Sequence, residues 1–385
     1  MSVTEITGTK NAPNKQERTR TLDASYYTKD DVLEREKSEL FFKSWQFVCH
    51  ESILSNAGQF ATFSLFGQDF FLIKSTDESL KAYFNVCPHR GHQLLKGQGK
   101  KSRISCPYHA WTFTLDGKLM GARGVKENPL IEKSDICLFE IKVDTLLGFV
   151  FVNFDLDAEP LNTFYPGLAE QVLAVCPDIH KMVLMGDSED FGHTYKCKSN
   201  WKVMLDNYLE CYHCQMAHPE FNDMMDITES SFSIHPNFTH QIAPTAMKAE
   251  TKAFPLNLEH DVLVGNFWYM FPNTTLGQFP GARGFYISRF DPITPHETVR
   301  TSLVLEPREP TDPDAPRRDK LRSKWTNEVV AREDQELCES VQRGMQLKAF
   351  KSGWYITDPS NHGISEHAMR YFHDLYLDHM RQLER

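Results

Sequence analysis

The sequence contains the stretch Cys87-Pro88-His89-Arg90-Gly91-His92 and, after a spacer, a second stretch of similar composition, Cys106-Pro107-Tyr108-His109. Each segment supplies one thiolate and one imidazole, and together they form the two-cysteine, two-histidine set that holds a [2Fe–2S] cluster. A proline follows each cysteine, and Gly91 adds backbone freedom, as two tight loops around a cluster require. The motif predicts four cluster ligands, Cys87, His89, Cys106 and His109, and leaves His92 outside the set.

Zinc is the main alternative, because structural zinc sites also take two cysteines and two histidines. Such sites usually pair cysteine with cysteine and histidine with histidine along the chain, whereas each segment here mixes the two. The mixed order favours the iron–sulfur cluster over zinc and over a chance arrangement.

Length and composition describe an ordinary globular protein. The 385 residues are 41% hydrophobic, 12% aromatic and 24% charged, which leaves room for two domains with cores. The formal net charge of −10 argues against a nucleic-acid-binding protein, which needs a basic face. No apolar run approaches the ~20 residues that span a bilayer, and no signal peptide is evident. We therefore expect a cytoplasmic protein without nucleic-acid or membrane partners.

The nine cysteines do not suggest a disulfide framework in a chain of this length. A reducing compartment would also suit an iron–sulfur site. The seven cysteines that are not predicted ligands, Cys49, Cys176 and Cys338 among them, are expected to be small buried side chains.

The first half of the chain predicts an arm, a helix and a small sheet. Residues 1 to about 20 lack apolar periodicity and predict a mobile arm. Residues 30–42 predict a capped helix with Val32 among its apolar positions. Short β-rich runs between 59 and 86, a hairpin at Asp116-Gly117 and a run at 148–155 predict an antiparallel domain that carries both ligand loops.

The second half predicts a mixture of helices and strands. Prolines 160 and 166 mark a linker, followed by a helix at 201–212, a strand at 298–308 and a long helix from about 317 to 345. We expect an α+β protein in three parts: an N-terminal arm and helix at 1–40, an all-β cluster domain at 41–157, and a larger α+β domain with an antiparallel sheet at 158–385.

A second metal site is predicted in the segment 207–219, where His213 and His218 stand five residues apart beside Glu210. On a helix, Asp206, Glu210 and His213 would share one face, and Pro219 favours a break near His218. Two histidines and one carboxylate with open positions form the facial triad of non-haem Fe(II) oxygenases. Unrelated polar histidines on a loop are the alternative.

The third ligand must come from elsewhere, and Asp334 is the candidate. At helical spacing Val330, Leu337 and Val341 predict an apolar face that also carries Asp334, and a carboxylate turned toward a core needs a cation or several donors. A buried ion pair with an arginine is the alternative. The neighbouring acids Glu333, Glu336 and Glu339 are predicted to be solvated or hydrogen-bonding.

These motifs resemble the oxygenase (α) subunits of Rieske non-haem iron oxygenases over nearly the whole chain. The resemblance rests on CPHRGH, CPYHAW, NWKVMLDNYLECYHCQMAHP and REDQELCESVQRGM, and GISEHAMRYFHDL is similar to the carnitine monooxygenase branch, near the glycine betaine and choline monooxygenases. It implies a Rieske domain joined to a helix-grip catalytic domain. It also implies a homotrimer in which the cluster of one subunit serves the iron of its neighbour.

The resemblance also assigns residues. It implies that Cys87, His89, Cys106 and His109 bind the cluster, and that His213, His218 and Asp334 bind mononuclear Fe(II). Most members have an aspartate that bridges the two sites, and the matching residue here is Glu210, a departure typical of the carnitine and betaine branch. Ala110 replaces a glycine common in the second loop, and we interpret this change as neutral.

The predicted function is hydroxylation, with O2, of a carbon next to the nitrogen of a quaternary-ammonium substrate. No nucleotide-binding fingerprint is present, so electrons must come from a separate NAD(P)H-dependent reductase. An aromatic box for the cation is predicted from Tyr208, Phe267, Trp268 and Tyr269, although such a run is also typical of a buried strand. The alternatives are a ring-hydroxylating oxygenase acting on an aromatic carboxylate and a Rieske electron-transfer protein with a degenerate iron site.

Overall fold

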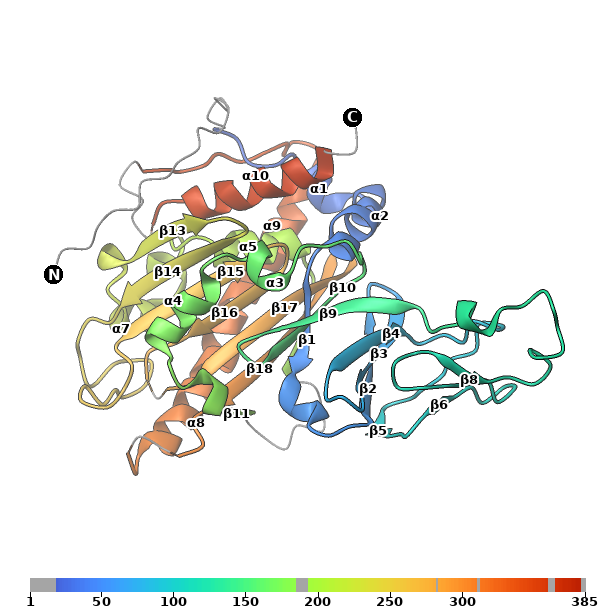
Figure 1. The fold of residues 1–385 in the computed structure, drawn as a ribbon. Helices are drawn as coiled ribbons and strands as arrows, with labels where there is room; N and C mark the ends of the chain where they lie inside the picture. Colours follow the sequence, from blue (N-terminus) through green and yellow to red (C-terminus); the bar gives the residue numbers. More distant parts are fainter. Residues whose placement is uncertain (1–18, 185–192, 282, 310–311, 359–363, 382–385) are drawn as a thin grey trace.

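A computed structural model describes residues 19–184, 193–281, 283–309, 312–358 and 364–381. Two antiparallel sheets organise these residues, one in each half of the chain (Figure 1). The α+β class with an all-β first domain is confirmed. The mobile arm predicted at residues 1 to about 20 lies almost wholly outside the described residues.

The first sheet has the strand order β1-β10-β9-β4-β3-β2-β5, and a separate three-stranded sheet, β6-β7-β8, carries the second ligand loop. The predicted hairpin at Asp116-Gly117 is the turn between β7 and β8, and Gly117 takes a φ of 76° there. The strands are β1 (Gln46–His50), β2 (Gln59–Leu65), β3 (Gln68–Lys74), β4 (Leu80–Phe84), β5 (Gln98–Lys100), β6 (Ile104–Ser105), β7 (Thr112–Phe113), β8 (Leu119–Gly121), β9 (Glu140–Leu146) and β10 (Phe149–Asn153).

The second sheet has the order β11-β18-β17-β16-β15-β14-β13, and β12 pairs with β18. Side chains alternate between its faces, so Trp268 and Met270 pack with α4 while Phe267 and Tyr269 lie on the opposite face. The strands are β11 (Val183–Leu184), β12 (His193–Cys197), β13 (Ser231–His235), β14 (Phe238–Pro244), β15 (Val264–Met270), β16 (Thr274–Gln278), β17 (Phe285–Thr294) and β18 (Glu297–Glu306).

Helices cover both faces of the second sheet. On one face α3 and α4 pack together with β1 and β10 of the first domain, and on the other lie α5, α9 and α10. The α-helices are α1 (Ser25–Thr28), α2 (Asp30–Glu39), α3 (Leu161–Phe164), α4 (Leu168–Val175), α5 (Trp201–Tyr208), α6 (Cys214–Ala217), α7 (Pro219–Met224), α8 (Ala315–Trp325), α9 (Ala331–Met345) and α10 (His367–Arg381).

Short helical turns connect these elements. The 3₁₀ turns are η1 (Phe41–Lys43), η2 (Glu51–Leu54), η3 (Lys133–Asp135), η4 (Ile179–Lys181) and η5 (Ile227–Glu229), and η6 (Thr326–Val330) is a π-helical segment. The proposed domain boundary at 157/158 lies between β10 and α3. No helix in the described part of the chain is long and apolar enough to cross a membrane.

The N-terminal helix α2 is attached to the second domain rather than to the sheet that follows it. Its Glu36 is fully buried, accepts hydrogen bonds from Trp201 Nε1 at 2.8 Å and Tyr376 OH at 2.6 Å, and pairs with buried Lys202. The buried positions of α2 are Leu33 and Glu36, whereas Val32, which was predicted to be apolar contact surface, is half-buried. Helices α2 and α10 are therefore joined to the start of α5, which leads to the predicted iron site.

The long helix predicted at 317–345 is interrupted, since η6 separates α8 from α9. The predicted apolar face of α9 is wrong: Leu337 and Val341 are exposed, and the buried positions are Cys338 and Gln342. Gln342 is held by hydrogen bonds to Asn200 N at 2.8 Å and to other partners. Hydrophobic periodicity overlooks such a face because its inner side chains are polar.

Candidate metal centres

The two predicted cluster loops meet at the tip of the first domain. Cys87 and Cys106 are buried beside each other, while His89 and His109 are exposed with ring centroids 4.7 Å apart. His89 stacks on Trp111 at 4.5 Å, which fixes its ring. Two thiols on the inside and two imidazoles on the outside fit a [2Fe–2S] cluster whose histidine edge faces outward.

The two loops have the same backbone design. Cys87 N–H donates to His92 O at 2.8 Å, and Cys106 N–H donates to Trp111 O at 2.8 Å. Gly91 and Ala110 stand at equivalent positions with φ angles of 72° and 59°. Ala110 therefore adopts a left-handed conformation that costs a residue with a Cβ roughly 1–2 kcal/mol, and its neutral effect on function stays a prediction.

His213 and His218 flank the short helix α6, which follows α5 after a turn. Asn200 caps α5 by accepting a hydrogen bond from Lys202 N at 3.0 Å, and the helix ends at Tyr208. The predicted helix at 201–212 is thus too long, because Glu210 Oε2 accepts the backbone N–H groups of Tyr212 and His213 and turns the chain.

Asp206 does not share a face with Glu210, contrary to the sequence prediction. Its carboxylate contacts Tyr27 OH and His373 Nε2, both at 2.7 Å, in the core formed with α1 and α10. Helical spacing did not apply to this pair because α5 ends between the two residues. Pro219, as expected, begins a new helix, α7, directly after His218.

His213, His218 and Asp334 lie together, with one ligand atom from each within 4.8 Å of the others. Asp334 Oδ1 is 2.9 Å from His218 Nε2 and 3.6 Å from His213 Nε2. Asp334 stands in the first turn of α9, directly after the π-helical segment. Two imidazoles and one carboxylate around one point fit mononuclear Fe(II), with positions left for other ligands.

A second carboxylate stands behind each histidine. His213 Nδ1 is 2.5 Å from Glu210 Oε1, and His218 Nδ1 is 2.7 Å from Glu333 Oε2. Each Nδ1–H thus has an acceptor, which leaves each Nε2 lone pair facing the point beside Asp334. This arrangement of carboxylate, histidine and metal point is typical of metal sites in proteins.

The pKa values of His213, His218 and Asp334 show that this cluster favours positive charge. Burial lowers the pKa of His213, but hydrogen bonds to Asp334 and Glu210 outweigh burial and raise that pKa to about 10. The same balance raises the pKa of His218. Burial raises the pKa of Asp334, yet hydrogen bonds with both histidines reverse the effect and lower it. Without metal the site holds protons in place of the positive charge that a metal ion would bring.

Replacing Glu333 should weaken iron binding, because Glu333 orients His218 and makes its imidazole more basic. We expect Glu333→Ala to lower the affinity for Fe(II) by about 10- to 100-fold, with a smaller loss in Glu333→Gln. Anaerobic competition with a chelator measures the affinity. Glu336, which is exposed on the same helix, provides the matched control Glu336→Gln. Unchanged iron affinity in both Glu333 variants would contradict this role.

The predicted aromatic box does not form as one site. Trp268 packs on the α4 side of the sheet, donates to Gln171 Oε1 at 3.2 Å and stacks on His240. Tyr269 lies in the core beneath α10, 5.5 Å from Phe372. Trp268 points to the opposite face of the sheet from Phe267, and Tyr269 lies two residues further along β15, in the core beneath α10. Of the four predicted residues, only Tyr208 and Phe267 therefore lie near the iron ligands.

Sequence reasoning missed most of the aromatic residues beside the iron ligands. Phe221 lies 6.2 Å from the His218 ring and stacks on Trp325, and Tyr286 OH is 3.1 Å from Tyr208 OH. Phe221, Tyr286 and Trp325 lie on three different elements, α7, β17 and α8, so no local sequence signal groups them. The aromatic cluster consists of Tyr208, Phe221, Phe254, Phe267, Phe279, Tyr286 and Trp325.

Two of the cysteines predicted to be buried and unpaired, Cys211 and Cys214, form a disulfide across the turn that carries His213. Their spacing of three residues in this turn brings the two sulfurs together. Cys137 is exposed, also against expectation, whereas Cys49, Cys176 and Cys338 are buried as predicted.

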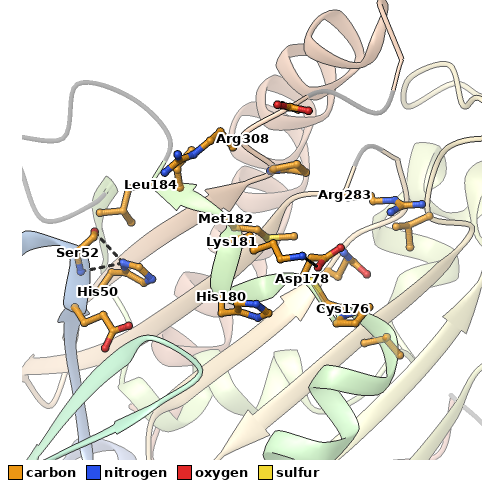
Figure 2. A pocket seen from close by; sticks show the side chains of 18 of the residues that line it. His50, Ser52, Cys176, Asp178, His180, Lys181, Met182, Leu184, Arg283 and Arg308 are labelled. Atoms are coloured by element: carbon orange, nitrogen blue, oxygen red, sulfur yellow. Dashed lines mark hydrogen bonds and ion pairs between the residues drawn. The ribbon is translucent and has the colours of Figure 1, made fainter.

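A cavity of about 1340 Å³ lies where the two domains meet, between η2 and the segment 175–184 (Figure 2). Its lining is highly charged, and Lys181 points to Asp178 with its Nζ 2.7 Å from the carboxylate. It contains none of the predicted ligands, so it is separate from both metal centres.

An all-β domain with paired Cys-His loops, joined to a helix-covered sheet with a two-histidine, one-carboxylate cluster, defines the Rieske-type oxygenase subunits as a class. Residues 44–135 match the family model for a Rieske [2Fe-2S] domain. Residues 188–382 match the model for a ring hydroxylating alpha subunit (catalytic domain). These matches favour the iron–sulfur cluster over zinc.

Relatives narrow the class. The carnitine monooxygenase oxygenase subunit of Escherichia coli is 36% identical over 359 residues, 92% of each chain. Choline monooxygenase of Amaranthus tricolor is 28% identical, over 89% of this chain and 75% of its own. The crystal structure of the quaternary ammonium Rieske monooxygenase CntA with L-carnitine is 33% identical and has a TM-score of 0.79, over 94% of this chain and 96% of that chain. The chain belongs to the family of carnitine monooxygenase oxygenase subunits, which are Rieske-type monooxygenases with a [2Fe–2S] cluster and mononuclear iron.

Proposed function

We propose that the chain hydroxylates a carbon next to the nitrogen of a carnitine- or betaine-type quaternary ammonium compound. Collapse of the hydroxylated product would then cleave the C–N bond or remove a methyl group. The observation that carries this proposal is the aromatic cluster beside His218. Ring faces attract a trimethylammonium group, which has no N–H to donate and is best held by cation–π contacts.

The roles of individual residues follow from their geometry. We propose Cys87, His89, Cys106 and His109 as cluster ligands. Their counterparts at the iron are His213, His218 and Asp334. Bound iron supplies the position at which O2 is activated, with electrons from the cluster. The chain's own side chains orient the ligands, through Glu210 and Glu333, and exclude water from the reacting carbon through the aromatic cluster.

The position of the two centres supports a homotrimer with electron transfer between subunits. Figure 1 shows β6 and β8 at the end of the molecule away from α5 and α9, so the cluster loops lie far from the iron ligands of their own chain. Exposed His89 and His109 at that tip suit contact with a neighbouring subunit. Inter-subunit electron transfer is likewise described for a quaternary ammonium Rieske monooxygenase of similar structure, which is 32% identical over 94% of this chain.

The chain also needs a source of electrons and a compartment that suits its cluster. A separate NAD(P)H-dependent reductase would deliver the electrons, because the sequence has no nucleotide-binding fingerprint. A reducing compartment keeps thiolate ligands available, so the cytoplasm is the proposed location.

Turnover tests the function directly. Reduced protein with a cognate reductase, O2 and one of carnitine, γ-butyrobetaine, glycine betaine, choline or benzoate should oxidise a quaternary ammonium compound. Product is measured by mass spectrometry, and trimethylamine or formaldehyde release reports C–N cleavage. Oxidation of benzoate alone would replace the proposal by the ring-hydroxylating alternative. No substrate oxidation despite cluster reduction would favour an electron-transfer protein.

A further inference from the structure

Arg300 on β18 differs from the buried arginines of the second domain. Those arginines are paired with aspartates: Arg289 with Asp291 at 2.6 Å, Arg318 with Asp261 at 2.7 Å, and Arg322 with Asp319 at 2.8 Å. Arg300 is half-buried, and no carboxylate in the described part of the chain pairs with it. Removing a guanidinium from water without a paired anion costs free energy. We therefore looked for an anionic partner of Arg300 outside the described residues.

The surroundings of Arg300 leave part of its donor set free. Its Nη2 donates to Ser288 Oγ at 3.1 Å, and its guanidinium also hydrogen bonds to the Tyr195 side chain. Its carbon Cζ lies 5.7 Å from the Tyr195 ring and 5.6 Å from the Phe290 ring. Its Nε is buried and has no hydrogen-bond partner among the described residues. An arginine offers five donors in a planar fork, and this fork is held by aromatic rings with donors to spare.

Arg300 faces the same side of the second sheet as the aromatic cluster. It stands opposite Phe290 on β17, and Tyr286 lies four residues earlier on the same face of that strand. Ser288, whose Oγ accepts from Arg300 Nη2, lies two residues after Tyr286 on that face, and Tyr286 OH is 3.1 Å from Tyr208 OH. Tyr208 ends α5 beside Asn207, whose Nδ2 is 3.4 Å from His213 Nε2. Arg300 therefore lies on the face of the second sheet that carries Tyr286, whose hydroxyl contacts Tyr208 at the end of α5.

We propose that Arg300 binds the carboxylate of the substrate. This inference rests on the proposed function, in which the trimethylammonium group at the other end of the substrate contacts the aromatic cluster. A carboxylate can accept two parallel N–H bonds from a guanidinium, which gives both affinity and orientation. Arg300 thereby selects zwitterionic quaternary ammonium compounds that carry a carboxylate, and choline, which has a hydroxyl at that end, lacks the group that it recognises.

The test compares Arg300→Gln and Arg300→Lys with the native chain. Isothermal titration calorimetry on the metal-loaded protein measures binding of carnitine, glycine betaine, choline and benzoate independently of turnover. We expect Arg300→Gln to weaken binding of carboxylate-bearing compounds by about 10- to 100-fold and to change choline binding less than about threefold. The affinity of Arg300→Lys for the carboxylate-bearing compounds should lie between those of the native chain and Arg300→Gln. Lys196, next to Tyr195 on β12 but 70% exposed, provides the control Lys196→Gln.

The outcomes separate this inference from the proposed function. Equal losses for choline and carnitine, or no loss for either, would overturn the role of Arg300. If the native chain binds only benzoate and Arg300→Gln abolishes that binding, the carboxylate role stands and the quaternary ammonium substrate falls. Metal content and the cluster spectrum should be unchanged in every variant, and if Arg300→Gln fails to fold, Arg300→Lys carries the comparison.

Discussion

Asp334→Ala should remove the mononuclear iron and lower turnover at least about 100-fold, while the visible spectrum of the cluster stays intact. Asp334 Oδ1 is the oxygen that both His213 and His218 approach, so its loss removes the one anionic ligand of the set. The cluster ligands belong to the other domain and keep their geometry. Iron and acid-labile sulfide assays, with the visible spectrum, separate the two centres.

The structure also supplies the control and the competing candidate for this experiment. Glu336→Ala, on the same helix and exposed, should retain iron and rate. Glu333 is adjacent to Asp334 and already lies 2.7 Å from His218. Iron that survives in Asp334→Ala and disappears only when Glu333→Ala is added would move the ligand role from Asp334 to Glu333.

Glu210→Gln should leave both metal centres assembled and slow the oxidation of the reduced cluster, in a single turnover with O2 and substrate, by about 10- to 100-fold. Glu210 uses both oxygens as acceptors, Oε1 toward His213 Nδ1 and Oε2 toward two backbone N–H groups. Glutamine replaces one acceptor by an NH2 group, so one side of this arrangement sets donor against donor. We propose that Glu210 also accepts a hydrogen bond from His109 of a neighbouring subunit, and in Glu210→Gln this contact loses its charged acceptor.

Rapid mixing of the pre-reduced trimer with O2 and substrate measures this rate, and iron content per chain verifies that the comparison is between loaded proteins. Glu210→Asp, which keeps both acceptor oxygens on a shorter side chain, should be less impaired. Glu229→Gln serves as an exposed control in the same region. Cluster oxidation at the native rate in Glu210→Gln would mean that electrons reach the iron by a route without Glu210.

Local pattern was sufficient wherever one short segment contains the whole signal. The cluster loops, the strands from residue 59 to 86 and the break at Pro219 depend on backbone preferences of a few neighbouring residues, so they could be predicted. The helix predicted at 201–212 failed because Glu210 takes the N–H groups of Tyr212 and His213. Hydrophobic periodicity cannot predict that the Glu210 carboxylate will compete with helix carbonyls for these backbone N–H groups.

The sequence by itself determined the chemistry of this protein: the ligand types, their spacing and the class of reaction that they support. Tertiary structure alone decided which side chains meet. It placed Asp334 against two histidines more than a hundred residues earlier, put Glu333 behind His218, and turned Trp268 to the opposite face from Phe267. It also left Arg300 without a paired carboxylate among the described residues, on the face of the sheet that carries Tyr286. The physical reason is that ligand chemistry is a property of residue types, whereas contact, burial and charge pairing depend on packing between distant elements.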